Sequence, residues 1–209
     1  MTVDSRSEYA ATPADGPSVH VIRARKLLVG GAAGGVASGD LVAVTGVARS
    51  EGVSVALVEQ PYRVAGRRSP APPRQLDVAW IAVLDHLRAG ELKGLPLVVG
   101  GRSMGARVAC RTAEATGAIG VLCLAFPLQP RRRAGGSAPQ SRLHELDETT
   151  VPTLVVQGAR DPFGIPPPSA NRTVVQVAGD HSLRTDLAAV ASAVREWLPG
   201  VVAQATASP

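Results

Sequence analysis

Aromatic residues are scarce in this chain: Phe, Trp and Tyr together make up 3% of its 209 residues. A core must therefore be built from Val, Leu, Ala and Ile, which suits a parallel sheet covered by Ala-rich helices. Hydrophobic residues make up 45% of the chain and charged residues 19%. This composition excludes a wholly disordered chain and a coiled coil.

Cysteine and long apolar runs are also rare. Cys110 and Cys123 are the two cysteines, both lie in apolar stretches, and no Cys/His spacing typical of a metal site is present. We expect two reduced core thiols in a cytoplasmic protein, with no metal and no organic cofactor. No apolar run approaches the roughly 18 residues of a membrane span, and the polar first 17 residues lack a signal peptide's apolar region. We expect no membrane partner.

Lysine is nearly missing. Lys26 and Lys93 are the lysines among 22 basic residues, and the net charge is +5. The arginines are spread along the chain, apart from the run at 131–133. A nucleic-acid-binding protein would gather them on one stripe with aromatic residues nearby, so nucleic acid is not the predicted partner.

Short apolar runs alternate with helical patterns along the chain. The runs are nearly continuous in Val, Leu, Ile and Ala, which indicates strands buried on both faces. Apolar spacing predicts helices over 75–89, over 104–115, and from Leu183 until Pro199-Gly200 stops the last one. The alternation predicts the α/β class, with a mostly parallel, doubly wound sheet flanked by helices. The expected strands are 19–22, 26–29, 53–58, 97–99, 120–125, 153–156 and 173–177.

The two ends of the chain are rich in small and polar residues. We expect disordered tails over 1–17 and 199–209, and a single domain over 18–198. Two irregular stretches, 61–73 and 127–151, each follow an expected strand. Loops that leave the carboxyl ends of strands build the binding site in this architecture, so these stretches form either its rims or solvated connections.

The most informative motif is Gly101-Arg102-Ser103-Met104-Gly105. It follows an expected buried strand and precedes an expected helix, which is the context that a G-x-S-x-G nucleophile elbow requires. The glycines permit a sharp turn, and the helix N-terminus supplies unpaired N–H groups. The motif predicts Ser103 as a nucleophile; the alternative is a glycine turn without chemistry.

A nucleophilic serine needs a base and an acid that orients it. His181 follows the last expected strand, where this fold delivers a catalytic base, and Asp161 follows the strand before it. The order Ser103, Asp161, His181 is that of α/β-hydrolases. We expect Asp161, rather than Asp180 or Asp186, to hold the imidazole of His181. The remaining histidines, which we expect to be structural or solvated, are His20, His86 and His144.

An oxyanion hole needs two backbone donors. One is expected from Met104, which follows the nucleophile, and the other from Ala32 in the small-residue segment 30–35. A glycine-rich turn of this kind can instead bind phosphate. The segment lacks the G-x-x-x-x-G-K-[ST] pattern and a clean G-x-G-x-x-G pattern, which favours the oxyanion reading.

The stretches 27–35, 59–68, 100–105, 151–164 and 179–183 resemble one family. The chain resembles small α/β-hydrolase-like proteins related to dienelactone hydrolase. More closely, it resembles predicted bacterial hydrolases that share their domain with a regulatory subunit of the nonspecific-lethal histone-acetylation complex. The resemblance implies an α/β-hydrolase fold with Ser103 as nucleophile, Asp161 as acid and His181 as base. Most relatives carry His-Gly at the start of the oxyanion loop, where this chain has Gly30-Gly31.

These observations predict a serine hydrolase of carboxylesterase or thioesterase type, which forms an acyl-enzyme on small esters or thioesters. A chain of 209 residues leaves no room for a large cap domain. We expect Tyr62, Arg63 and Arg102 to contact the substrate, with the arginines favouring an anionic acyl group. The alternative is a catalytically silent interaction module with the same fold. The sequence leaves the oligomeric state open.

Overall fold

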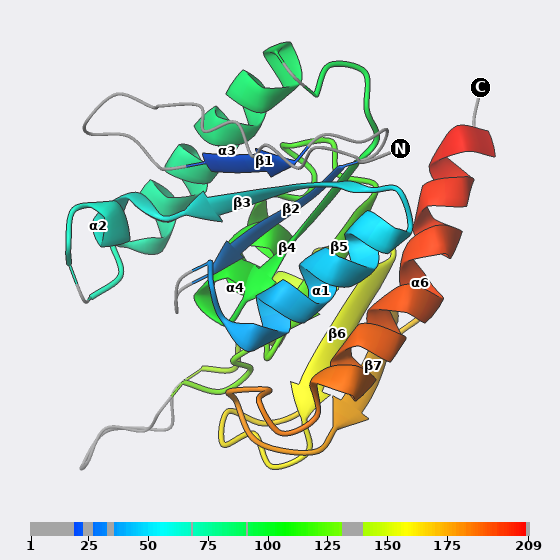
Figure 1. Cartoon of the computed structure of the whole chain (residues 1–209). Helices are drawn as coiled ribbons and strands as arrows, with labels where there is room; N and C mark the ends of the chain where they lie inside the picture. Colours follow the sequence, from blue (N-terminus) through cyan, green and yellow to red (C-terminus); the bar gives the residue numbers. More distant parts are fainter. Residues whose placement is uncertain are drawn as a thin grey trace.

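The computed structural model describes residues 19–22, 27–32, 36–67, 69–90, 92–130 and 140–207. Within these residues seven strands form one sheet, in the order β1-β3-β2-β4-β5-β6-β7 (Figure 1). β1 runs antiparallel to β3, and all the other neighbours are parallel. The strands are β1 Val19–Ile22, β2 Leu27–Ala32, β3 Ser54–Glu59, β4 Leu97–Arg102, β5 Gly120–Leu124, β6 Thr153–Gly158 and β7 Arg172–Val177.

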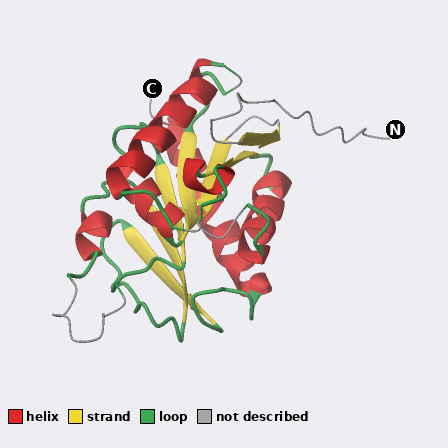
Figure 2. Cartoon of the chain, turned by 90° about the vertical axis from the view of Figure 1, so that its left-hand side faces the viewer, coloured by secondary structure: helices red, strands yellow, loops and turns green. Residues whose placement is uncertain are grey.

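Helices cover both faces of this sheet (Figure 2). On one face a buried cluster that includes Trp80, Leu84 and Val99 packs between the sheet and helices α3 and α4. On the other face a second cluster, which includes Val44 and Val194, packs between the sheet and helices α1 and α6. The helices are α1 Gly39–Ser50, α2 Pro61–Val64, α3 Pro73–Ala89, α4 Met104–Thr112, α5 Leu143–Asp147 and α6 Leu187–Ala207. The predicted α/β class and mostly parallel, doubly wound sheet are confirmed.

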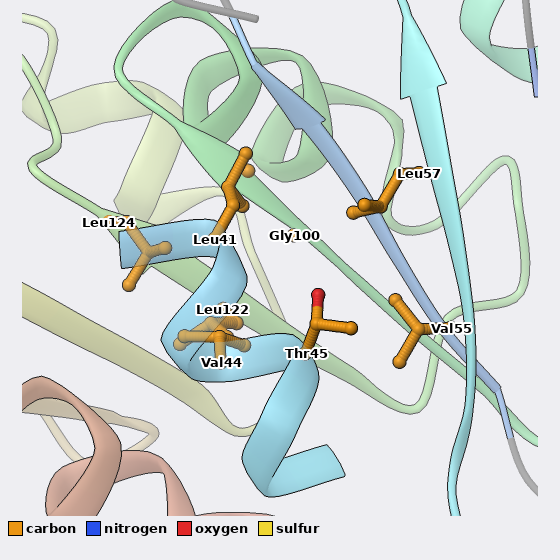
Figure 3. Close-up of a pocket in the computed structure, with 9 residues that line it drawn as sticks. Leu41, Val44, Thr45, Val55, Leu57, Gly100, Leu122 and Leu124 are labelled. Carbon is orange, nitrogen blue, oxygen red and sulfur yellow. The ribbon is translucent and has the colours of Figure 1, made fainter. Parts of the chain in front are cut away.

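Glycines lie side by side in the middle of the sheet. Gly30 of β2 is the register partner of Gly100 of β4, and Gly31 is the partner of Gly101. A Cβ atom on Gly100 would lie 2.7 Å from the carbonyl oxygen of Leu122, so no larger residue fits there without a backbone shift. Helix α1 lies over Gly100, and a small apolar pocket remains between them (Figure 3). The central strands thus reach the nucleophile turn with little side-chain bulk on this face.

The C-terminal helix differs from its prediction at both ends. It begins at Leu187, because Leu183 sits in the preceding turn with φ +51°. It also continues through Pro199 to Ala207, so the expected stop, and with it the expected tail from residue 199, is wrong. A proline inside a helix costs about 3 kcal/mol. Burying Val201 and Val202 recovers about 1.5–3 kcal/mol each, which offsets that cost.

Three helices were not predicted. The α1 stripe of Leu41, Val44, Val47 and Ala48 has helical spacing, but glycine and β-branched residues lower the helix propensity of this segment. The two short helices α2 and α5 occupy the irregular stretches 61–73 and 127–151. None of the helices in the described part of the chain is long and apolar enough to cross a membrane. The expected tail over 1–17 and the arginine run 131–133 lie outside the described residues.

Candidate active site

Ser103 forms a sharp turn between β4 and α4. Its backbone has φ +55° and ψ −110°, a conformation that costs a non-glycine residue about 1–3 kcal/mol. The Ser103 N–H donates to the carbonyl of Leu124 on β5 at 2.8 Å, which fixes the turn to the neighbouring strand. The geometry is that of a strained elbow that lifts the serine side chain off the end of β4.

The side chains of Ser103, His181 and Asp161 form one continuous chain of contacts. Ser103 Oγ lies 2.9 Å from His181 Nε2, and His181 Nδ1 lies 2.8 Å from Asp161 Oδ2. The Asp161 side chain is fully buried, while that of His181 is 20% exposed. With the Nδ1 proton donated to the carboxylate, Nε2 is the acceptor that faces the serine hydroxyl.

The two other candidate acids point elsewhere. Asp180 Oδ1 accepts hydrogen bonds from the backbone N–H and the hydroxyl of Ser182, and these bonds lower the pKa of the exposed Asp180 carboxyl. Asp186 Oδ1 accepts from the Ala189 N–H, as a cap of α6. The carboxylate beside His181 therefore belongs to Asp161.

Gln157 fixes the Asp161 carboxylate by a hydrogen bond from β6. This fully buried side chain of β6 donates from Nε2 to Asp161 Oδ2 at 2.8 Å and to the Gly164 carbonyl at 2.9 Å. Its Oε1 accepts from the Phe126 N–H at 2.8 Å, and the Phe163 N–H donates to Asp161 Oδ1 at 2.9 Å. The sequence analysis missed Gln157. Its signal was a polar residue at the end of an apolar strand, four residues before the predicted acid.

The loop that carries His181 is shaped by close backbone packing. A Cβ atom on Gly158 would collide with the Asp180 carbonyl, so this loop lies directly on the end of β6. Gly179 has φ +112°, and Leu183 is buried with φ +51°. The Phe163 ring lies 4.5 Å from the His181 ring, at an interplanar angle of 58°. These contacts limit how far the imidazole can move.

Arg102 lies beside the elbow but turns into the protein. Its Nε is 2.9 Å from Asp40 Oδ2 at the start of α1, and its Nη2 donates to the carbonyl of His181 at 2.9 Å. The side chains of Arg102 and Asp40 are 15% and 1% exposed. The guanidinium thus contacts protein groups on two elements, and its expected substrate contact stays a prediction.

One expected oxyanion donor lies just after β4, and the other ends the adjacent strand β2. Met104 is the first residue of α4, where a backbone N–H has no partner within the helix. Ala32 ends β2, and its register partner on β4 is Arg102, the residue before the serine. Residues 33–35 of the expected oxyanion segment lie outside the described residues. The sheet register therefore brings the backbone of Ala32 to the level of the elbow.

The remaining predicted contacts lie on α2, which follows β3 on the far side of β2 and β4 from β6 and β7 (Figure 1). Tyr62 is 6% exposed and belongs to the core cluster of α3 and α4, and burial raises the pKa of its hydroxyl. Arg63 Nε lies 3.3 Å from Glu59 Oε1. Their expected role toward substrate stays a prediction. His86 is exposed, as expected, and His144, which was expected to be structural, is exposed as well.

A buried ion-pair network lies on the α4 side of the sheet. Arg107 Nη2 lies 2.5 Å from Glu145 Oε1, and Arg111 bridges Glu145 and Asp77 at 3.1 and 2.6 Å. Burial alone would raise the pKa of Glu145, but the two arginines outweigh it and hold that pKa below its ordinary range. The network fastens α5 to the helix that begins at the elbow. The described residues contain no cluster of three or more side chains suited to a metal ion.

Comparison with known proteins places this elbow-bearing parallel sheet in a family. Residues 23–197 match the model of the alpha/beta hydrolase domain, and the chain belongs to that family. No curated protein matches the chain at a significant level. The predicted burial of Cys110 and Cys123 is also confirmed, and their reduced state stays a prediction.

Solved structures share the fold over almost the whole chain. Est1E from Butyrivibrio proteoclasticus is 16% identical, with 94% of this chain and 98% of that one covered and a TM-score of 0.72. XC6422 from Xanthomonas campestris, described as an α/β serine hydrolase without a lid, is 17% identical, with 98% of each chain covered and a TM-score of 0.71. An α/β serine hydrolase homologue from Coxiella burnetii is 14% identical, with 94% and 98% covered and a TM-score of 0.69. At these identities the likeness shows the fold.

Proposed function

We propose that the protein is a serine hydrolase that cleaves small esters or thioesters through an acyl-enzyme. The observation that carries this proposal is the unbroken path from Ser103 Oγ through the His181 ring to the Asp161 carboxylate, at 2.9 and 2.8 Å. Such an arrangement on a strained strand–helix turn serves nucleophilic attack, because the imidazole can take the hydroxyl proton as the new bond forms.

In each half of the reaction His181 first accepts a proton and then donates it. Ser103 Oγ attacks the carbonyl carbon while its proton moves to His181 Nε2, and the oxyanion accepts hydrogen bonds from the Met104 and Ala32 N–H groups. The imidazolium, stabilised by Asp161, then gives that proton to the departing alkoxide or thiolate. A water molecule then attacks the acyl carbon while its proton moves to His181. The imidazolium gives that proton to Ser103 Oγ as the bond between the acyl group and the serine breaks.

The size of the fold favours small substrates. The segment between β5 and β6 contains the short helix α5 among its described residues, rather than a cap domain. Est1E, one of the structural neighbours, has been solved with ferulic acid bound, and another neighbour is a thioesterase domain from the curacin biosynthetic pathway. These names support carboxylic esters or thioesters as the substrate class. The link to dienelactone hydrolase stays a prediction at this finer level.

We infer a cytoplasmic location from the chemistry of the two thiols. Cys110 and Cys123 are both free, and their sulfur atoms lie 3.5 Å apart. Two thiols this close are expected to stay unbonded in a reducing compartment, and this expectation supports the cytoplasm.

A fluorophosphonate probe followed by a panel of p-nitrophenyl esters of increasing chain length tests the proposal. The wild-type protein is expected to be labelled. Ser103→Ala is expected to lose labelling, and its esterase rate is expected to fall by a factor on the order of 10⁴ to 10⁶. Ser182→Ala is the matched control, because Ser182 follows the base directly but bonds to Asp180. A wild-type protein that neither labels nor turns over any ester would favour the interaction-module alternative.

A further inference from the structure

Arg102 connects the nucleophile turn, helix α1 and the loop of the base. It is the residue directly before Ser103, and it ends β4 on the face that α1 covers. From there its guanidinium lies 2.9 Å from the Asp40 carboxylate and donates at 2.9 Å to the carbonyl of His181. The Arg102 side chain thus links the main chain at His181 to the main chain directly before Ser103.

Asp40 supplies the force that holds this guanidinium in place. A carboxylate with 1% of its side chain exposed needs compensation for its lost hydration. The Leu41 N–H and the first turn of α1 provide part of it, and Arg102 provides the opposite charge. The contact between Arg102 Nε and Asp40 Oδ2 is ionic rather than an aligned hydrogen bond. The aligned hydrogen bond of Arg102 is the one to His181.

The main chain at His181 needs such an anchor. It lies within the connection 178–186, between Gly179 at φ +112° and Leu183 at φ +51°, and its ring must stay 2.9 Å from Ser103 Oγ. A displacement of about 1 Å in a catalytic group can cost on the order of 100-fold in rate. A hydrogen bond to the His181 carbonyl acts on the backbone from which the ring extends.

We propose that Arg102 is a positioning residue: held by Asp40, its guanidinium fixes the main chain of His181 and thereby sets the base against Ser103. This inference rests on the proposed function, since it assigns His181 the role of base. It differs from a substrate contact by Arg102 in a measurable way. Loss of a positioning residue lowers kcat, whereas loss of a contact that binds the substrate raises KM.

Two Arg102 variants distinguish the effect of the hydrogen bond to the His181 carbonyl from the effect of leaving the Asp40 charge buried without a partner. Arg102→Lys keeps a cation beside Asp40 but loses the planar fork that reaches two acceptors. Arg102→Met combined with Asp40→Asn removes both charges, so no unpaired carboxylate is left to unfold the protein. Arg111→Met is the matched control: Arg111 is 16% exposed in its own ion pair with Asp77, against 15% for Arg102.

Steady-state kinetics on a p-nitrophenyl ester give the first readout. Both Arg102 variants are expected to lose about 10- to 100-fold in kcat with KM within about threefold of wild type. Arg111→Met is expected to lower stability to urea while keeping kcat within about threefold. A KM increase at unchanged kcat in the Arg102 variants would overturn the proposal in favour of a substrate contact, and unchanged kinetics would overturn it outright.

Hydrogen exchange of the peptide 178–186 gives a second readout that needs no activity. Exchange there is expected to be faster in both Arg102 variants than in wild type, and unchanged in Arg111→Met. If the wild type is neither labelled nor active, the proposed function fails. The exchange measurement alone then tests whether Arg102 fixes the main chain of His181. Unchanged exchange over 178–186 in the double variant would overturn this role.

Discussion

Replacing Gln157 with methionine tests how the predicted acid is held. The two side chains have similar length and volume, so the change removes the amide while filling its space. The Phe126 N–H and the Gly164 carbonyl then lose the partners described above. A buried polar group left without a partner costs about 1–3 kcal/mol, and the partly buried Gly164 carbonyl adds less, so the two together cost about 3 kcal/mol. Asp161 also loses one of its donors.

Gln157→Glu separates the shape of this side chain from its donor. The introduced carboxyl can still accept from the Phe126 N–H, but its other oxygen faces Asp161 Oδ2. Two carboxylates in contact cannot both ionise at low cost, so the folded state raises the pKa of the introduced carboxyl. A raised folded pKa means that the variant is close to wild type near pH 4 and loses stability as the pH rises toward 8.

Urea unfolding followed by tryptophan fluorescence measures both effects. Gln157→Met is expected to unfold at lower urea with an unchanged m value, and to lose esterase activity about tenfold. Gln176→Met is the control, because Gln176 is exposed on β7, and a change there is expected to stay within about 0.5 kcal/mol. A Gln157→Met variant within about 1 kcal/mol of wild type, or a pH-independent Gln157→Glu variant, would refute the reasoning.

Two further predictions concern the α4 side of the sheet. Because Arg107 and Arg111 hold the pKa of Glu145 below its ordinary range, this carboxyl stabilises the fold above that range and loses its contribution as the pH falls through the lower folded value. Glu145→Gln is therefore expected to be less stable at pH 7 and to lose stability less steeply in acid, as measured by urea unfolding from pH 7 to 3; equal slopes would contradict it. A hydrogen bond with the Cys110 thiol and burial both raise the pKa of the Cys123 thiol. Iodoacetamide at pH 8 is expected to modify neither cysteine until urea is added, and mass spectrometry that finds native protein alkylated would argue against this.

Most of the sheet follows from the sequence because its strands are apolar on both sides. The predicted and observed strands differ by a few residues, mainly where glycines were assigned to loops. Gly30 and Gly100 continue β2 and β4, since neighbouring backbones pair without needing a side chain. Helix α1 escaped prediction because its packing against α6, distant in sequence, rather than its own propensity, stabilises it.

The candidate site was predictable where chain order alone brings residues together. Loops after parallel strands meet at one edge of a sheet, so Ser103, Asp161 and His181 could be grouped before their distances were known. Asp40 and Gln157 could not be grouped in this way, because their roles depend on contacts across elements. Tyr62 resembled a rim residue in the sequence, but α2 turns its ring into the core.

The pairing of α1 with α6 also sets when the buried cluster between these helices and the sheet can form during synthesis. Leu41 and Val44 of α1 pack in the same buried cluster as Val201 and Val202 of α6, and strands β3 to β7 are synthesised between the two pairs. Synthesis proceeds at about 5–20 residues per second, and chains begin to fold as they emerge. The apolar face that α6 covers therefore stays exposed until α6 has been made. Ser103 likewise waits for His181. A nascent chain therefore exposes an apolar surface, and Ser103 lacks its contact with His181, until both α6 and His181 have been synthesised.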